Sequence, residues 1–158
     1  LYYRYSIPKH QLKDKIFGVF DHQINPARLR LMQGFTDIFP MPISRYTETR
    51  YADIKKIQSI DVLAESSSTG IGMIIDNQTD DLFIFNHLEY DVNTLDQEYK
   101  RDLEVKKNIQ LPHNYYPDDD FKNTPLNKWR PFAFLLFANW VNQLYQKTPY
   151  DLTSLAKQ

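Results

Sequence analysis

The chain has no cysteine, few glycines and no long apolar run. Its 158 residues include only four glycines. Without cysteine it can form neither a disulfide framework nor a thiolate metal site. No segment approaches the roughly 20 consecutive apolar residues that a membrane-spanning helix needs. We therefore expect no membrane partner, and a cytoplasmic location is the default.

The sequence also has no excess of positive or of negative residues. The chain carries 19 Lys and Arg against 20 Asp and Glu, a net charge of −1. There is thus no basic field to attract nucleic acid, which we do not expect as a partner. Hydrophobic residues make up 42% and aromatic residues 15% of the chain. That composition suffices for the core of one domain or for half of a larger domain.

The most informative segment is 85–91, where a histidine and a glutamate follow an apolar run. His87 and Glu89 are two residues apart, so in an extended backbone their side chains point to the same side. An imidazole oriented by a carboxylate forms two of the three members of a nucleophile, histidine and acid triad. The nucleophile is then either one of the many hydroxyls or a group outside this chain.

The start of the chain favours the second possibility. The segment begins at Leu1 rather than at methionine, and residues 1–7 read as the last turns of a helix whose start signal is missing. We expect this chain to be the C-terminal part of a longer protein.

Apolar runs alternate with helical patterns along the chain. Runs rich in β-formers predict buried strands at 15–20, 61–65, 71–75 and 81–85. The stretch 21–48 contains Pro26, Gly34, Pro40 and Pro42 and reads as a long irregular loop, a class that is usually functional. Helices are expected at 51–58, 93–108 and 131–145. The last is apolar on more than one face, which indicates deep burial or a subunit interface, so a homodimer is plausible.

This order of elements predicts an α/β sheet with helices on its faces. Functional sites in such sheets gather at the carboxyl ends of strands. His87 and Glu89 occupy a place of that kind.

Seven short segments carry a specific resemblance. They are 15–22 (KIFGVFDH), 34–37 (GFTD), 44–48 (SRYTE), 87–91 (HLEYD), 98–102 (EYKRD), 139–140 (NW) and 148–152 (TPYDL). In order and spacing they resemble the homoserine O-acyltransferases, also called homoserine O-succinyltransferases or transsuccinylases, of methionine biosynthesis. The match runs over nearly the whole chain.

The resemblance implies a fold, a reaction and a set of site residues. The fold is similar to the class I glutamine amidotransferases, a flavodoxin-like sheet with helices on both faces, of which residues 1–158 form the C-terminal part. A catalytic cysteine falls shortly before Leu1 and carries the acyl group. His87 matches the catalytic histidine and Glu89 its orienting acid. Substrate contacts are implied for Lys15, Ser44 and Arg101, and a homodimer is implied as well.

The residue types suit this chemistry. Acyl transfer from an acyl-CoA co-substrate to an amino-acid hydroxyl needs a base for the alcohol proton, which His87 can provide. Arg101 is a fork-shaped partner for the carboxylate of a small hydroxyl amino acid. Lys15 adds a second cation for a carboxylate or a coenzyme phosphate, and Ser44 a hydroxyl for the polar groups of the acceptor.

Simpler interpretations stay open for these residues. Arg101 lies three residues after Glu98 on a predicted helix, a spacing that also fits a solvated ion pair. Lys15 can be a charge that flanks a strand, and Ser44 a turn residue after Pro42. The spacing alone favours these structural roles, and only the resemblance favours substrate contacts.

Two departures from the family pattern affect the choice of acceptor. The family usually reads Pro-His-Ser-Arg where residues 42–45 read Pro-Ile-Ser-Arg, and Gly-His-Pro-Glu where residues 86–89 read Asn-His-Leu-Glu. We expect transfer to homoserine. Serine O-acetyltransferase activity, an amidotransferase-like hydrolase and a non-catalytic relative remain alternatives.

Metal chemistry is not indicated. The three aspartates 118–120 lack the spacing of a calcium loop, and His10, His22 and His113 are too far apart in sequence for metal-ligand spacing. We expect no metal and no cofactor beyond the acyl-CoA co-substrate.

Overall fold

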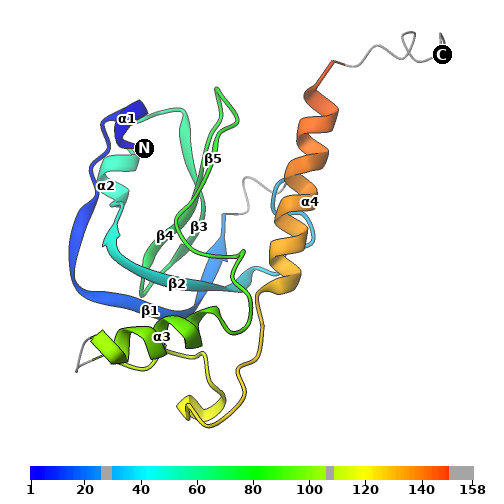
Figure 1. Cartoon of the computed structure of the whole chain (residues 1–158). Coiled ribbons are helices and arrows are strands. Elements are labelled where there is room, and N and C mark those ends of the chain that lie inside the picture. Colours follow the sequence, from blue (N-terminus) through cyan, green and yellow to red (C-terminus); the bar gives the residue numbers. More distant parts are fainter. Residues whose placement is uncertain (26–29, 106–108, 150–158) are drawn as a thin grey trace, which may run out of the picture.

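A curled antiparallel sheet forms the centre of the molecule in the computed structural model, which describes residues 1–25, 30–105 and 109–149 (Figure 1). Within this part the sheet has five strands in the order β2-β1-β3-β4-β5. The elements in chain order are α1 (Tyr2–Tyr5), β1 (His10–Ile24), β2 (Ile38–Glu48), α2 (Tyr51–Ile54), β3 (Ile60–Ser66), β4 (Gly70–Asp76), β5 (Leu82–Ile84), α3 (Thr94–Val105), the 3₁₀ turn η2 (Pro117–Asp119) and α4 (Arg130–Lys147).

Every strand pairing in the described sheet is antiparallel. A flavodoxin-like sheet is built from parallel strands, which need crossover helices between them. The described residues thus show a mixed α and β architecture. They do not by themselves show the amidotransferase-like class.

The expected irregular loop over 21–48 is wrong for most of its length. β1 continues to Ile24, and β2 begins at Ile38 and pairs with it, for instance His22 with Phe39. Both prolines of β2 are tolerated because β2 is the edge strand of the sheet, where a missing N–H need not break a ladder. Residues 26–29 of the predicted loop lie outside the described residues.

The three shorter strands are confirmed, at β3, β4 and β5. The helix expected at 51–58 is shorter than predicted and ends at Ile54. Tight turns follow it, with Ile57 N–H donating to the Ile54 carbonyl and Ile60 N–H to that of Ile57, and they redirect the chain into β3. The expected N-terminal helical turn is α1. The helix predicted at 93–108 is α3, and residues 106–108 lie outside the described residues.

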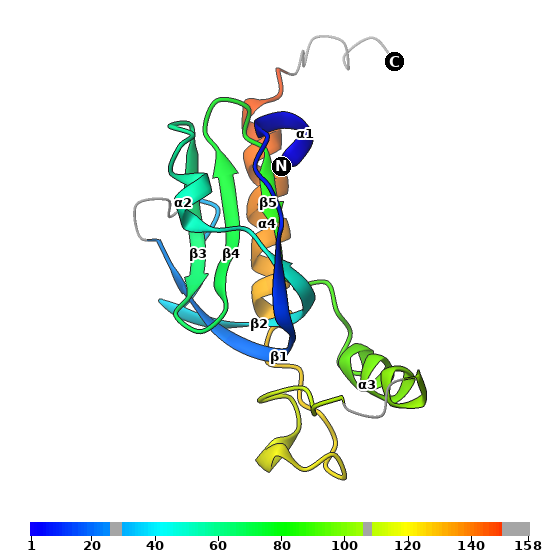
Figure 2. The same ribbon diagram turned by 90° about the vertical axis from the view of Figure 1, so that its left-hand side faces the viewer.

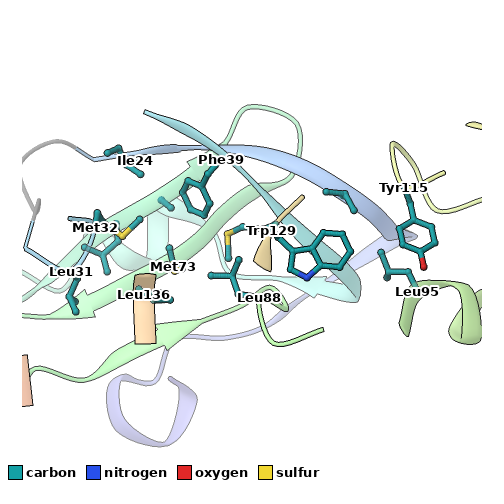
Figure 3. Packing of buried hydrophobic residues seen from close by; sticks show 14 of the residues in the cluster. Ile24, Leu31, Met32, Phe39, Met73, Leu88, Leu95, Tyr115, Trp129 and Leu136 are labelled. Atoms are coloured by element: carbon teal, nitrogen blue, oxygen red, sulfur yellow. The ribbon is translucent and has the colours of Figure 1, made fainter. Parts of the chain in front are cut away.

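Apolar side chains pack on both faces of the sheet. Figure 3 shows the main cluster, in which Trp129 and Leu136 bring the start of α4 onto Phe39 and Met73. Alternate residues of β4 point to the other face, where Ile74 packs in a second cluster with residues of α2 and the N-terminal segment. Helices thus cover the two faces as expected, with α4 on one side and α1 and α2 on the other (Figure 1).

α4 has a second apolar face that nothing in the described part of the chain covers. Leu136 is its only buried residue. Six large apolar side chains of this helix are exposed: Phe134, Phe137, Trp140, Val141, Leu144 and Tyr145. The predicted apolarity on more than one face is therefore real. Among the described helices, none is long and apolar enough to span a membrane.

Candidate active site

His87 lies in a turn that follows β5, not in an extended segment. Its carbonyl accepts a hydrogen bond from Tyr90 N–H at 3.2 Å, which closes the turn. The extended backbone predicted for this segment is therefore wrong. The predicted pairing nevertheless forms, because His87 Nδ1 donates to Glu89 Oε1 at 2.8 Å. No residue in the described part of the chain hydrogen-bonds to the other ring nitrogen, Nε2, and the side chain of His87 is 31% exposed.

The ring of Tyr90 packs against one face of the His87 imidazole. The two rings stack with the centroids 4.2 Å apart and the planes 12° from parallel. The Tyr90 hydroxyl donates to Glu98 Oε1 at 2.7 Å. Burial, and then the Glu98 carboxylate, raise the pKa of Tyr90, so the phenol stays protonated and remains a donor.

Glu98 is the centre of a polar network between α3 and the sheet. Besides Tyr90, it accepts hydrogen bonds at Oε2 from the Ser44 hydroxyl and from Lys15 Nζ, the latter at 3.5 Å. Burial raises the pKa of Glu98, but the hydrogen bonds from Ser44 and Tyr90 and the charge of Lys15 outweigh it and leave the pKa lowered. Glu98 is therefore an ionised carboxylate in a largely enclosed position.

Lys15 and Arg101 both bind Asp102, one turn after Glu98. Lys15 Nζ lies 3.0 Å from Asp102 Oδ2, and Arg101 Nε and Nη2 lie 3.1 and 2.9 Å from Oδ1. The side chain of Arg101 is 64% exposed. Arg101 is thus held beside the network with its guanidinium open to solvent, and its partner is Asp102 rather than the Glu98 that spacing suggested.

The five predicted residues come from four parts of the fold. Lys15 lies on β1, Ser44 on β2, His87 and Glu89 on the turn after β5, and Arg101 on α3. In Figure 2, α3 lies outside the sheet and next to β1. Hydrogen bonds connect Lys15, Ser44 and Arg101 through Glu98 and Asp102, and Tyr90 extends that network to the histidine. The roles assigned to them stay predictions.

Sequence reasoning missed three members of this network: Tyr90, Glu98 and Asp102. A signal for two of them was available. Glu98 and Asp102 are four residues apart on a helix and lie on the same face. Two carboxylates on the face that also carries Arg101 could have been assigned together as a charged surface of the site.

A cavity of about 260 Å³ adjoins Lys15. It is lined by Lys13, Asp14, Lys15, Phe17, Tyr46, Ile109 and Gln110. Lys15 Nζ lies 3.9 Å from the centroid of the Phe17 ring, so the ammonium also makes a cation–π contact. Another cavity, of about 400 Å³ between β1, β3 and α2, contains none of the predicted site residues.

Among the residues that the structure describes, the network contains a histidine and charged groups but no activated nucleophile. Ser44 Oγ donates to Glu98, and the chain has no cysteine. Within the described residues, no three His, Asp or Glu side chains are grouped as a metal site requires. The arrangement can take up a proton at His87 Nε2 and bind an ammonium at Glu98 and a carboxylate at Arg101.

Asn86 and Leu88, the two departures beside His87, fit the backbone without strain. Asn86 is not among the described residues with positive φ, so its position needs no glycine. Leu88 is 2% exposed and belongs to the main apolar cluster. Both side chains are buried on either side of the histidine.

Comparison with known proteins supports the resemblance. Residues 1–150 match the family model described as homoserine O-succinyltransferase. The chain is 43% identical over 159 residues to the homoserine O-acetyltransferase of Rhizobium rhizogenes, covering 100% of this chain and 51% of that protein. It is also 43% identical over 152 residues to the homoserine O-acetyltransferase of Geobacillus kaustophilus, covering 96% of this chain and 50% of that protein.

A solved structure resembles the fold. The crystal structure of SMU.1228c matches with a TM-score of 0.60 at 13% identity, over 89% of this chain and 57% of that chain. The chain spans about half the length of the curated relatives it matches. The family match over residues 1–150 nevertheless covers almost all of it, and the chain belongs to the homoserine O-succinyltransferase family.

Proposed function

We propose that the complete protein transfers an acyl group from acyl-CoA to the hydroxyl of homoserine, and that this chain supplies the base and the acceptor site. The observation that carries the proposal is the His87–Glu89 pair, linked through Tyr90 to Glu98 beside Arg101. A base thus lies next to a carboxylate and a guanidinium, which complement the two charges of an amino acid. The family match supports homoserine as that amino acid.

The transfer proceeds in two steps. A cysteine in the remainder of the protein attacks the thioester and releases free coenzyme A. The homoserine hydroxyl then attacks the acyl-cysteine, the new ester bond forms as the thioester breaks, and His87 Nε2 takes the hydroxyl proton and returns it to the departing thiolate. Glu89 holds the proton on Nδ1, which keeps Nε2 as the acceptor and stabilises the imidazolium that forms.

Recognition of the acceptor uses the network on α3. Glu98 receives the ammonium of homoserine, and Arg101 exchanges Asp102 for the substrate carboxylate in a charge-assisted fork. Lys15 binds both Glu98 and Asp102 and so keeps these two like charges in place. Ser44 contributes the hydroxyl that orients Glu98 and contacts the substrate.

The acyl group is acetyl or succinyl. The relatives named above are called acetyltransferases, whereas the family description names succinyl transfer. The O-acylhomoserine formed would enter methionine biosynthesis. We further propose that the antiparallel sheet is the C-terminal part of an amidotransferase-like domain that the remainder of the protein completes.

Release of free coenzyme A by the complete protein tests this function. Acetyl-CoA and succinyl-CoA are each offered with homoserine and with serine, and glutamine hydrolysis is measured in parallel. Turnover with homoserine is the expected result. Turnover with serine alone would reassign the protein as a serine O-acetyltransferase, and ammonia release from glutamine without acyl transfer would make it a hydrolase.

A further inference from the structure

Three consecutive residues, the last of which is His87, are each hydrogen-bonded to a different strand. Phe85 N–H donates to the Gly72 carbonyl of β4 at 2.9 Å, and His87 N–H donates to the Pro42 carbonyl of β2 at 2.8 Å. Between them, the side-chain amide of Asn86 donates to His22 of β1 at 2.8 Å. The middle bond is the only one of these three that depends on a side chain and can be removed by substitution.

The Asn86–His22 hydrogen bond is buried, and its donor and acceptor are fixed. Asn86 is 2% exposed and His22 is 0% exposed. His22 Nδ1 lies 2.9 Å from the Phe20 carbonyl and must donate to it, so Nε2 is left as the acceptor for Asn86 Nδ2. This arrangement requires a neutral imidazole, and burial lowers the pKa of His22 to about 4.

Gly72 provides the space in which the pair meets. A Cβ at this position would lie 2.6 Å from His22 Cδ2, 2.9 Å from His22 Nε2 and 3.1 Å from Asn86 Nδ2. The first two distances are too short for any real contact. A larger residue here would push the two partners apart without removing a donor or an acceptor.

The pair is a poor way to gain stability. Asn86 Oδ1 is buried without a hydrogen-bond partner, and an unsatisfied buried acceptor costs about 1–3 kcal/mol. Apolar residues of similar size at both positions would avoid that cost, whereas replacing Asn86 alone leaves His22 Nε2 without a donor. The pair instead provides a hydrogen bond between β1 and Asn86, the residue immediately before His87.

We infer that Asn86 is a positioning residue for His87, with His22 as its acceptor and Gly72 as the gap that admits both. The hydrogen bond fixes the backbone at residue 86 and thereby the place of the His87 ring over Tyr90. The kinetic consequence rests on the proposed acyl transfer, whereas the structural consequence does not.

The kinetic test uses variants of the complete protein. Asn86→Leu keeps the size but removes the donor, and we expect kcat to fall by about 10- to 100-fold with KM for homoserine nearly unchanged, because small misplacements of a catalytic group cost that much. His22→Leu should match it, and the double variant should be no slower than the slower single variant. His22→Gln restores an acceptor and should retain activity within about three-fold of wild type.

Leu63→Ala is the matched control. Leu63 is a fully buried core residue of β3, so its truncation destabilises the fold without removing a hydrogen bond of residues 85–87. Assayed well below its unfolding temperature, it should keep kcat within two-fold of wild type. If Asn86→Leu kept wild-type kcat, or if His22→Gln were as slow as His22→Leu, the inference would be wrong.

Amide hydrogen exchange provides a readout that does not need activity. In Asn86→Leu, and in Gly72→Ala if the first variant does not fold, the His87 amide should exchange at least ten-fold faster than in wild type. Unchanged protection of this amide would overturn the inference. A complete protein that shows no acyl transfer at all would reject the proposed function and leave this measurement to decide the positioning role.

Discussion

The Tyr90 hydroxyl donates to Glu98 Oε1 at 2.7 Å and joins the histidine turn to α3. Tyr90 also stacks on His87, so a single side chain contacts both the proposed base and the carboxylate that we assign to the acceptor. A shift of α3 would therefore move Tyr90 and with it the position of the His87 imidazole.

Replacement of the base should abolish turnover. In the complete protein, His87→Ala removes the group that we propose takes the hydroxyl proton, a contribution of about 10²–10⁴-fold or more. His10→Ala is the control, because His10 Nε2 lies 2.8 Å from Asp53 Oδ2 and forms a similar histidine–carboxylate pair away from the site. Coenzyme A release should vanish in the first variant and persist in the second. Near-normal turnover in His87→Ala would refute the assignment.

Loss of the Tyr90 hydroxyl should weaken acceptor binding and catalysis moderately. Tyr90→Phe keeps the ring that stacks on His87 but removes the bond to the Glu98 carboxylate, and such a bond contributes about 1.5–3 kcal/mol. We expect kcat/KM for homoserine to fall by about ten-fold or more. Tyr145→Phe, at an exposed position of α4, should have no effect. Equal activity of the two variants would show that the Tyr90 hydroxyl is dispensable.

Neutralisation of Glu98 should act mainly on KM. Glu98→Gln removes the charge that we assign to the homoserine ammonium and leaves Lys15 with Asp102 alone. We expect KM for homoserine to rise by about ten-fold or more, while KM for the acyl donor changes little. Glu104→Gln, on the same helix but exposed, is the control. Steady-state kinetics with both substrates varied would contradict the assignment if the two variants behaved alike.

Stability should fall on the acid side because of His22. Burial lowers the pKa of His22 from 6.5 to about 4, so between these values the unfolded chain takes up a proton that the native protein refuses. The free energy of unfolding therefore decreases as the pH falls, by about 2 kcal/mol from this group between pH 7 and pH 5. Urea unfolding at the two pH values should show a smaller difference in His22→Gln. The same difference in both proteins would exclude His22 as the cause.

A methyl group at Gly18 should destabilise the protein strongly. A Cβ there would lie 2.3 Å from the carbonyl oxygen of His113, with φ at +142°. We expect Gly18→Ala to cost about 3 kcal/mol or more. Gly70 also has a positive φ, +78°, but nothing within 4 Å of an added Cβ, so Gly70→Ala should cost only the backbone strain of about 1–2 kcal/mol. Thermal unfolding of both variants separates the two effects, and equal costs would mean that the contact with His113 relaxes freely.

Local hydrophobic patterns were sufficient to predict the strands and helices that bury one or both of their faces. The apolar runs of β3, β4 and β5 and the helical periodicity of α3 and α4 are visible in the sequence and are present in the structure. The His87–Glu89 pair was also predictable, although for the wrong backbone reason. Two side chains separated by one residue can meet in a turn as well as in a strand, and the composition of the segment does not distinguish these cases.

Partner choice between distant segments required the tertiary structure. Periodicity shows that a strand is buried, but it says nothing about which strand lies beside it or in which direction. The prolines of β2 therefore looked like loop residues until its edge position was known. The same holds for Glu98, which is one acidic residue of a polar helix in the sequence. Only the fold brings Lys15, Ser44 and Tyr90 to it from positions 83, 54 and 8 residues away, because hydrogen bonds between such side chains form only after the backbone has been packed.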